Sequence, residues 1–151
     1  MKTRLLRSFL KPELVRVNIS ATCKREAILT LLNIVDDAGS LRDRDEAERV
    51  VFERERNMST GLERGVAIPH GKTDSVDNLL VAIATKPDGL DFDSADGQPA
   101  KILVLTLSPA GRSGPHIRFM AEISRLLRDD VLRRRVVEAQ SADEIVSLLT
   151  R

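Results

Sequence analysis

The sequence has very few aromatic residues and almost no net charge. It contains four phenylalanines, no tryptophan and no tyrosine, and its formal net charge at pH 7 is +1. Proteins that bind nucleic acid usually present a positive field or aromatic side chains on which bases stack. We therefore expect a protein that does not bind nucleic acid.

Cysteine and long apolar runs are nearly absent as well. The single cysteine, Cys23, excludes an internal disulfide and fits a reducing compartment. No apolar run approaches the roughly 20 residues of a membrane span, and residues 1–10 are too short and too charged for a signal peptide. We expect a cytoplasmic protein without direct membrane insertion. A thiol near a helix start can be reactive, but we interpret Cys23 as a small buried side chain.

Histidine is scarce, because the chain has only His70 and His116. Two distant histidines and a remote cysteine lack the closely spaced ligand pairs of zinc sites, so we expect no metal and no cofactor. The Gly-Lys-Thr at residues 71–73 is no phosphate-binding loop, because five residues rather than four separate Gly65 from Gly71. A serine hydrolase is equally unsupported, since no Gly-x-Ser-x-Gly occurs.

The sequence does contain helical patterns spread along its length. Apolar spacing or capping residues predict helices within residues 1–10, from Ser20 or Thr22 to about 37, from Asp43, after Pro115, from Asp129 or Asp130, and after the capping box Ser141-x-x-Glu144. In the helix after Pro115, the spacing directs these residues inward: Ile117, Met120, Ala121, Ser124 and Leu127.

Strand patterns lie between these helices. Apolar runs or alternation predict strands at residues 14–17, 66–68, 79–85 and 102–107, with loops at 87–89 and 94–99. The two longest apolar runs suggest strands that are covered on both faces. Helices that interleave with such strands predict an α/β fold, and 151 residues with 42% hydrophobic content suit one domain.

Residues 65–71 are the most distinctive stretch, because small apolar residues lead into proline, histidine and glycine. Pro69 has no N–H for a strand ladder, so His70 should be held rigidly at the mouth of a sheet. Pro115 fits the first helical position, which places His116 in a first turn that favours anions. Because neutral imidazole can act as a nucleophile near neutral pH, the two histidines predict phosphoryl or acyl transfer.

Several charged residues have two interpretations. Arg54 continues the apolar stripe of its helix, where an inward guanidinium would need an anion, but a frayed helix end would let it reach solvent. We interpret Glu53, Glu55 and Arg56 as a solvated face. The basic run at residues 133–135 could dock an acidic partner, although such runs are more often simply solvated.

Four segments together carry a family resemblance: residues 53–56, 59–62, 65–71 and 115–117. They resemble the enzyme IIA domain of the bacterial phosphoenolpyruvate-dependent phosphotransferase system, of the fructose/mannitol type that includes the nitrogen-regulatory branch. The resemblance covers nearly the whole chain, so we expect one type 2 IIA domain over residues 1–151. It implies an α/β fold with a central mixed sheet flanked by helices on both faces.

The resemblance also implies the roles of individual residues. His70 would accept a phosphoryl group from the phosphohistidine of HPr or its nitrogen-branch counterpart, without metal or nucleotide. His116 would orient the group or stabilise its charge, Arg54 would neutralise phosphate charge, and Thr60 is a weaker candidate that offers a loop hydroxyl. For His70 to attack while neutral, its other ring nitrogen should donate to a backbone carbonyl or similar acceptor.

The acceptor implied by the resemblance is a IIB protein or a regulatory target. Because the 151 residues leave no room for IIB or membrane IIC domains, we favour the nitrogen-regulatory branch at this point. The alternatives are a standalone IIA component of a fructose/mannitol-type sugar uptake system, and a regulatory binding protein that performs no onward transfer.

Overall fold

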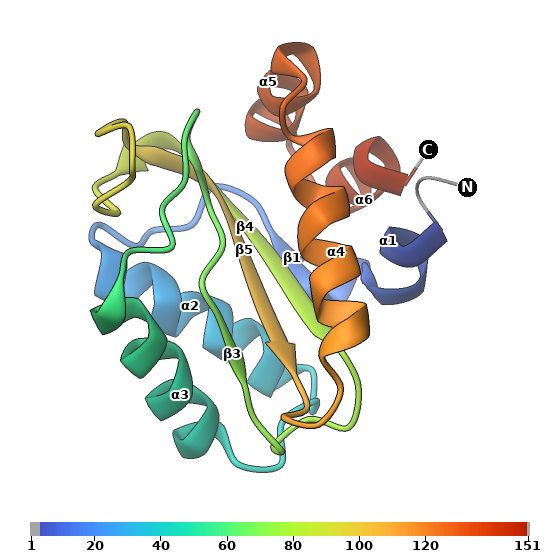
Figure 1. Ribbon diagram of the computed structural model, residues 1–151. Coiled ribbons are helices and arrows are strands. Elements are labelled where there is room, and N and C mark those ends of the chain that lie inside the picture. Colours follow the sequence, from blue (N-terminus) through green and yellow to red (C-terminus); the bar gives the residue numbers. More distant parts are fainter. Residues whose placement is uncertain (1–3, 151) are drawn as a thin grey trace.

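The chain is built around a mixed sheet of five strands, as a computed structural model shows for residues 4–150 (Figure 1). The strands are β1 (Val15–Arg16), β2 (Val66–Ala67), β3 (His70–Lys72), β4 (Leu80–Leu90) and β5 (Ala100–Ser108). The helices are α1 (Arg4–Phe9), α2 (Lys24–Asp37), α3 (Arg44–Asn57), α4 (Ser113–Leu126), α5 (Asp130–Glu138) and α6 (Ala142–Thr150), with a 3-10 turn η1 at Pro12–Leu14.

The sheet has its two long strands in the centre and its short strands at the edges. Its order is β1-β4-β5-β2, and β3 pairs with the later part of β5, beyond β2. β4 runs antiparallel to β5, whereas β1, β2 and β3 are parallel to their neighbours. The sheet is therefore mixed, as the resemblance implied.

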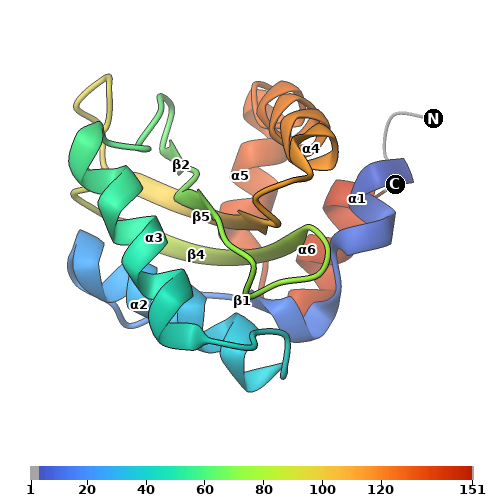
Figure 2. The ribbon, with the colours of Figure 1, turned by 60° about the horizontal axis from the view of Figure 1, so that its bottom comes forward.

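Helices cover both faces of this sheet (Figures 1 and 2). On β5, Leu103 and Leu105 pack into a core with α2 and α3, while Ile102 and Val104 pack into a second core with α1, α4, α5 and α6. Successive strand residues point to opposite faces, so one strand supplies both cores. The predicted α/β fold with helices on both faces is confirmed.

Two local predictions, for residues 87–89 and for Cys23, are wrong. Residues 87–89 belong to β4 instead of forming a loop, because the register shift between Thr85 and Leu90 accommodates Pro87 as a bulge. Cys23 is exposed at the N-cap of α2 and makes no side-chain capping bond there. Thr22 instead donates from its backbone and its hydroxyl to Glu26, each at 2.8 Å.

The inward face of α4 also differs from the prediction. The helix begins at Ser113, so Pro115 is its third residue rather than its first. The buried residues of α4 are His116, Phe119 and Ile123, whereas Ile117 is 63% exposed. The inward face predicted from apolar spacing is wrong because a polar residue, His116, occupies one of the inward positions. His116 is thereby directed at the sheet.

Candidate functional site

His70 is the first residue of β3, where the chain resumes pairing after an interruption at residues 68–69. β2 ends at Ala67, as the proline predicts, and His70 then lies opposite Thr106 of β5. Gly71 points at α3, since a Cβ there would lie 2.7 Å from Val50 Cγ1. Alternation along the strand therefore directs His70 to the other face, toward α4. The absence of a side chain at Gly71 therefore allows the close approach of helix α3.

One ring nitrogen of His70 is held by the backbone. Nδ1 lies 2.8 Å from the carbonyl oxygen of Ile68. A carbonyl can only accept, so the contact places the proton on Nδ1 and leaves Nε2 with a free lone pair. A backbone carbonyl is the kind of acceptor expected from the sequence, and the contact leaves Nε2 as the unprotonated ring nitrogen.

His116 faces His70 from α4. The ring centroids are 5.5 Å apart and the planes are inclined by 51°. The side chain is 7% exposed, and its Nδ1 has no hydrogen-bond partner among the described residues. Burial lowers the pKa of His116 to about 4, reinforced by the charge that His70 carries when it is protonated and by the charge of Lys72. The structure thus brings the two histidines together, and His116 is neutral at pH 7.

The lowered pKa of His116 predicts a loss of stability in mild acid. An unfolded histidine takes up its proton near pH 6.5, but folded His116 resists protonation until about pH 4, so unfolding is favoured as the pH falls between these values. We expect wild type to lose on the order of 1–2 kcal/mol more than His116→Gln between pH 7 and 4.5. Urea unfolding at both pH values measures this difference. Equal losses in the two proteins would contradict it.

A lysine and two hydroxyls complete this part of the site. Lys72 shares the face of His70, and its Nζ donates to Ser113 Oγ at 2.9 Å, at the start of α4. Thr106 and Ser108 alternate with leucines of the α2 core and so point toward α4. Their buried hydroxyl oxygens have no partner among the described residues. Sequence reasoning missed these groups, although the two-residue period from His70 could have indicated Lys72.

Arg54 matches neither of its two interpretations. Helix α3 continues to Asn57, so Arg54 lies in its last turn, one turn beyond Val50. It is half-buried, and its guanidinium donates to the carbonyl of Met58 at 2.7 Å. Arg54 therefore caps the end of its own helix, on the element that packs against β3.

Thr60 and Glu55 differ more clearly from expectation. Glu55 is 7% exposed and not part of a solvated face. Its carboxylate accepts the hydroxyl and the backbone N–H of Thr60, and it pairs with Lys24 Nζ at 2.8 Å. The prediction failed because the partner, Lys24, comes from a different helix. The hydroxyl of Thr60 is thus bound to Glu55 and not directed at the imidazole of His70.

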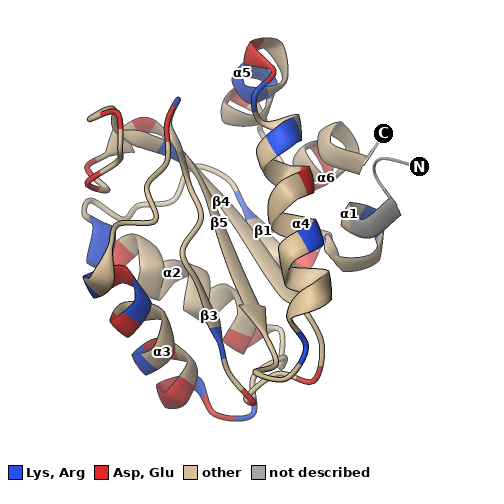
Figure 3. Cartoon of the chain, viewed as in Figure 1, with Lys and Arg blue, Asp and Glu red and all other residues tan. Residues whose placement is uncertain are grey.

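The basic run in the middle of α5, residues 133–135, is partly structural. Arg133 donates to the carbonyls of Leu127 and Arg128 at 2.8 and 2.9 Å and pairs with Asp130. It therefore holds the turn between α4 and α5. Figure 3 shows that charged residues otherwise gather on helices and loops, while the central strands carry few.

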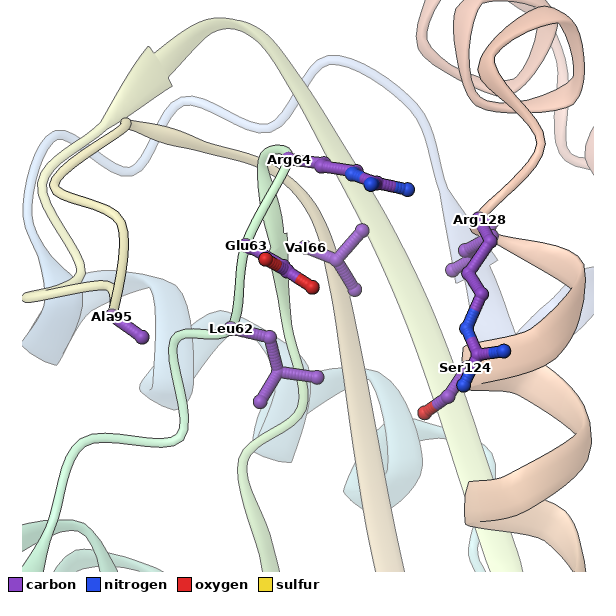
Figure 4. A pocket seen from close by; sticks show the side chains of 8 residues that line it. Leu62, Glu63, Arg64, Val66, Ala95, Ser124 and Arg128 are labelled. Atoms are coloured by element: carbon purple, nitrogen blue, oxygen red, sulfur yellow. The ribbon is translucent and has the colours of Figure 1, made fainter.

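A cavity of about 320 Å³ lies between the loop before β2 and helix α4 (Figure 4). Leu62 and Val66 project from one wall, and on the other wall Ser124 projects from α4 and Arg128 from the turn after it. Neither histidine lines this cavity. Within residues 4–150, no group of histidine, cysteine, aspartate and glutamate residues could hold a metal ion. No described helix has the length and apolarity to cross a membrane.

The fold and the site define an α/β protein with two adjacent imidazoles, one of them at the start of a short strand. Comparison with protein families matches residues 8–151 to the model described as "Phosphoenolpyruvate-dependent sugar phosphotransferase system, EIIA 2". The chain therefore belongs to this family of phosphotransferase system IIA phosphocarriers, as its sequence motifs indicated.

Proteins named as fructose-specific components and proteins named as nitrogen regulatory proteins are both similar to this chain. The fructose-specific EIIA component of Haloferax volcanii is 37% identical over 91% of this chain and 89% of that protein. The nitrogen regulatory protein of Bradyrhizobium diazoefficiens is 33% identical over 91% of this chain and 90% of its own length. The crystal structure of nitrogen regulatory protein IIA-Ntr from Neisseria meningitidis superposes with a TM-score of 0.88, at 25% identity over 97% of this chain and 99% of that one.

A similar segment also occurs within longer proteins. In the fructose-specific EIIABC component of Bacillus subtilis, 34% identical over 91% of this chain, the matching region makes up 22% of that protein. The length of the Haloferax volcanii protein, by contrast, shows that a fructose-specific EIIA component need not carry further domains. Chain length is therefore no argument for the nitrogen-regulatory branch.

Proposed function

We propose that residues 1–151 form one IIA domain, in which Nε2 of His70 accepts a phosphoryl group from the phosphohistidine of an HPr-like carrier in the cytoplasm. The observation that carries this proposal is the hydrogen bond from His70 Nδ1 to the Ile68 carbonyl, in an imidazole that lies beside the ring of His116. A neutral imidazole with a fixed tautomer is the state that can attack phosphorus.

The transfer exchanges one nitrogen–phosphorus bond for another. The bond from His70 Nε2 to phosphorus forms as the bond to the carrier's imidazole breaks, and that bond's electron pair returns to the carrier. Such a step depends mainly on positioning and on stabilising the charge of the phosphoryl oxygens. Lys72 supplies a positive charge on the same face, and the unpaired hydroxyls of Thr106 and Ser108 add potential donors nearby.

His116 and Arg54 have distinct parts in this scheme. His116 lies beside His70 and is neutral at pH 7, so it orients the phosphoryl group through a hydrogen bond and not through charge. Arg54 provides charge stabilisation once its guanidinium turns from the carbonyl of Met58 toward the bound group. Neither role requires a metal or a nucleotide.

The onward recipient is a IIB protein or a regulatory target, and the same histidine serves both. The relatives named for fructose and for nitrogen regulation cover similar shares of this chain. Transfer to a IIB protein makes the chain a transport component. Retention of the phosphoryl group as a binding signal makes it a regulator.

Incubation with enzyme I, labelled phosphoenolpyruvate and either HPr or its nitrogen-branch counterpart tests the proposal. We expect an acid-labile, alkali-stable phosphate that mass analysis maps to His70. Addition of a fructose-type IIB protein then distinguishes the recipients, because loss of the label to IIB indicates transport and its retention indicates regulation. The absence of label with both carriers would contradict phosphoryl transfer by this chain.

A further inference from the structure

A continuous set of hydrogen bonds leads from helix α3 to the imidazole of His70. Glu55 accepts the backbone N–H of Thr60 at 2.8 Å and also accepts its hydroxyl. The Thr60 carbonyl accepts the N–H of Ile68 at 3.0 Å. The Ile68 carbonyl in turn accepts Nδ1–H of His70 at 2.8 Å. We call Glu55, Thr60 and Ile68 the Glu55 bracket.

The bracket supports Ile68, whose N–H does not pair with the sheet, whereas the next residue is held by β5 through the Pro69 carbonyl, which accepts the N–H of Thr106 at 3.0 Å. Ile68 lies between β2 and β3, so its N–H pairs with Thr60 and not with β5. Pro69, the next residue, has no N–H to contribute. The orientation of the Ile68 carbonyl therefore depends on the loop that contains Thr60 as well as on β5, and Glu55 binds that loop to α3.

Burial makes the bracket rigid. Thr60 is 3% exposed and Ile68 is 1% exposed, and the side chain of Glu55 is 5% exposed. A buried carboxylate is costly unless it is paired and hydrogen-bonded, and the pairing with Lys24 together with the two bonds from Thr60 meets this requirement. Loss of any one partner leaves polar groups unsatisfied and loosens the loop.

We propose that Glu55 is a positioning residue for phosphoryl transfer, acting through Thr60 and Ile68 to hold the proton of His70 on Nδ1. The inference rests on the proposed function for its effect on the reaction. Glu55 touches neither His70 nor the transferred group, so its influence is carried by the orientation of one backbone carbonyl. When that carbonyl is displaced, the imidazole is free to change tautomer and angle, and Nε2 is no longer the sole nucleophilic atom.

Two substitutions test the bracket from its two ends. Glu55→Gln keeps the size of the side chain but replaces one acceptor by an amide donor, which opposes the donors of Thr60 or Lys24. Thr60→Val removes only the hydroxyl, and Thr60→Ser restores it. The matched control is Glu53→Gln, the same change on an exposed residue two positions earlier, which bonds only to Arg49 within the described chain.

The tautomer of His70 is the decisive measurement, because a purely structural role for Glu55 would not change it in a folded protein. Nitrogen-15 NMR of the imidazole should show Nδ1–H in wild type, Glu53→Gln and Thr60→Ser, and a mixture of tautomers in Glu55→Gln and Thr60→Val. The rate of phosphorylation by the carrier should fall about 10- to 100-fold in the latter two. Circular dichroism confirms that each variant is folded.

The outcomes separate this inference from the proposed function. Folded Glu55→Gln and Thr60→Val proteins with the wild-type tautomer and rate would overturn the role of Glu55. If Glu55→Gln does not fold, Thr60→Val alone decides the question. If wild type takes up no phosphate, the proposed function fails, whereas the tautomer measurement still shows whether the bracket controls His70.

Discussion

Replacement of His70 by alanine is expected to abolish phosphate uptake and leave the protein folded. The substitution removes the attacking Nε2, and His116 is a poor substitute because it is buried and faces the sheet. His70 is half-buried on a short edge strand, and its described hydrogen bond is to the Ile68 carbonyl, so its loss leaves both cores intact. Labelling with phosphoenolpyruvate should fall at least about 1000-fold.

The control for this variant is its unfolding by urea, which should give a midpoint close to that of wild type. Full labelling of folded His70→Ala would remove His70 from the reaction. Mass analysis of that product would then show which residue carries the phosphate.

Replacement of His116 by alanine should impair onward transfer more than phosphate uptake. The variant keeps the nucleophile and its tautomer, so the carrier can still phosphorylate it. It loses the imidazole whose ring centroid lies 5.5 Å from that of His70 and which we propose orients the transferred group. The loss of one such donor typically costs about 100- to 1000-fold. The measurement is release of label from the phosphorylated variant to a IIB protein, compared with the rate of its own labelling.

His116→Gln is the matched control, because its amide retains an N–H donor of similar reach without an ionisable ring. It should recover part of the onward rate. Wild-type kinetics in both directions for His116→Ala would reduce His116 to a packing residue under α4.

The central part of the fold was predictable because its signals are local. Residues 102–107 form a continuous apolar run, and such a run is typical of a strand buried on both faces, which β5 is. Asp43 caps α3 and Ser141 caps α6 through bonds to residues three positions on, as their spacing indicated. The inward face of α4 was less predictable, because His116 interrupts its apolar pattern.

The candidate site was predictable only where its residues carry an unusual local context. His70 lies beside proline and glycine, and so does His116, and the structure places the two ring centroids 5.5 Å apart. Glu55 had no such context, since a glutamate between arginines on a helix resembles a solvated face. Glu55 can be buried because its carboxylate pairs with Lys24 on another helix. A local sequence pattern does not indicate a contact between two helices.

Both edges of the sheet, as described over residues 4–150, consist of strands only two or three residues long. β1 forms one edge, and β2 and β3 form the other, with the interruption at residues 68–69 between them. None of these edge strands is itself long enough to template a strand from another chain, and short edge strands are one way in which native sheets avoid edge-to-edge aggregation. We therefore expect a protein that meets His70 to be recognised through side chains, so that the encounter can end once the proposed transfer is complete.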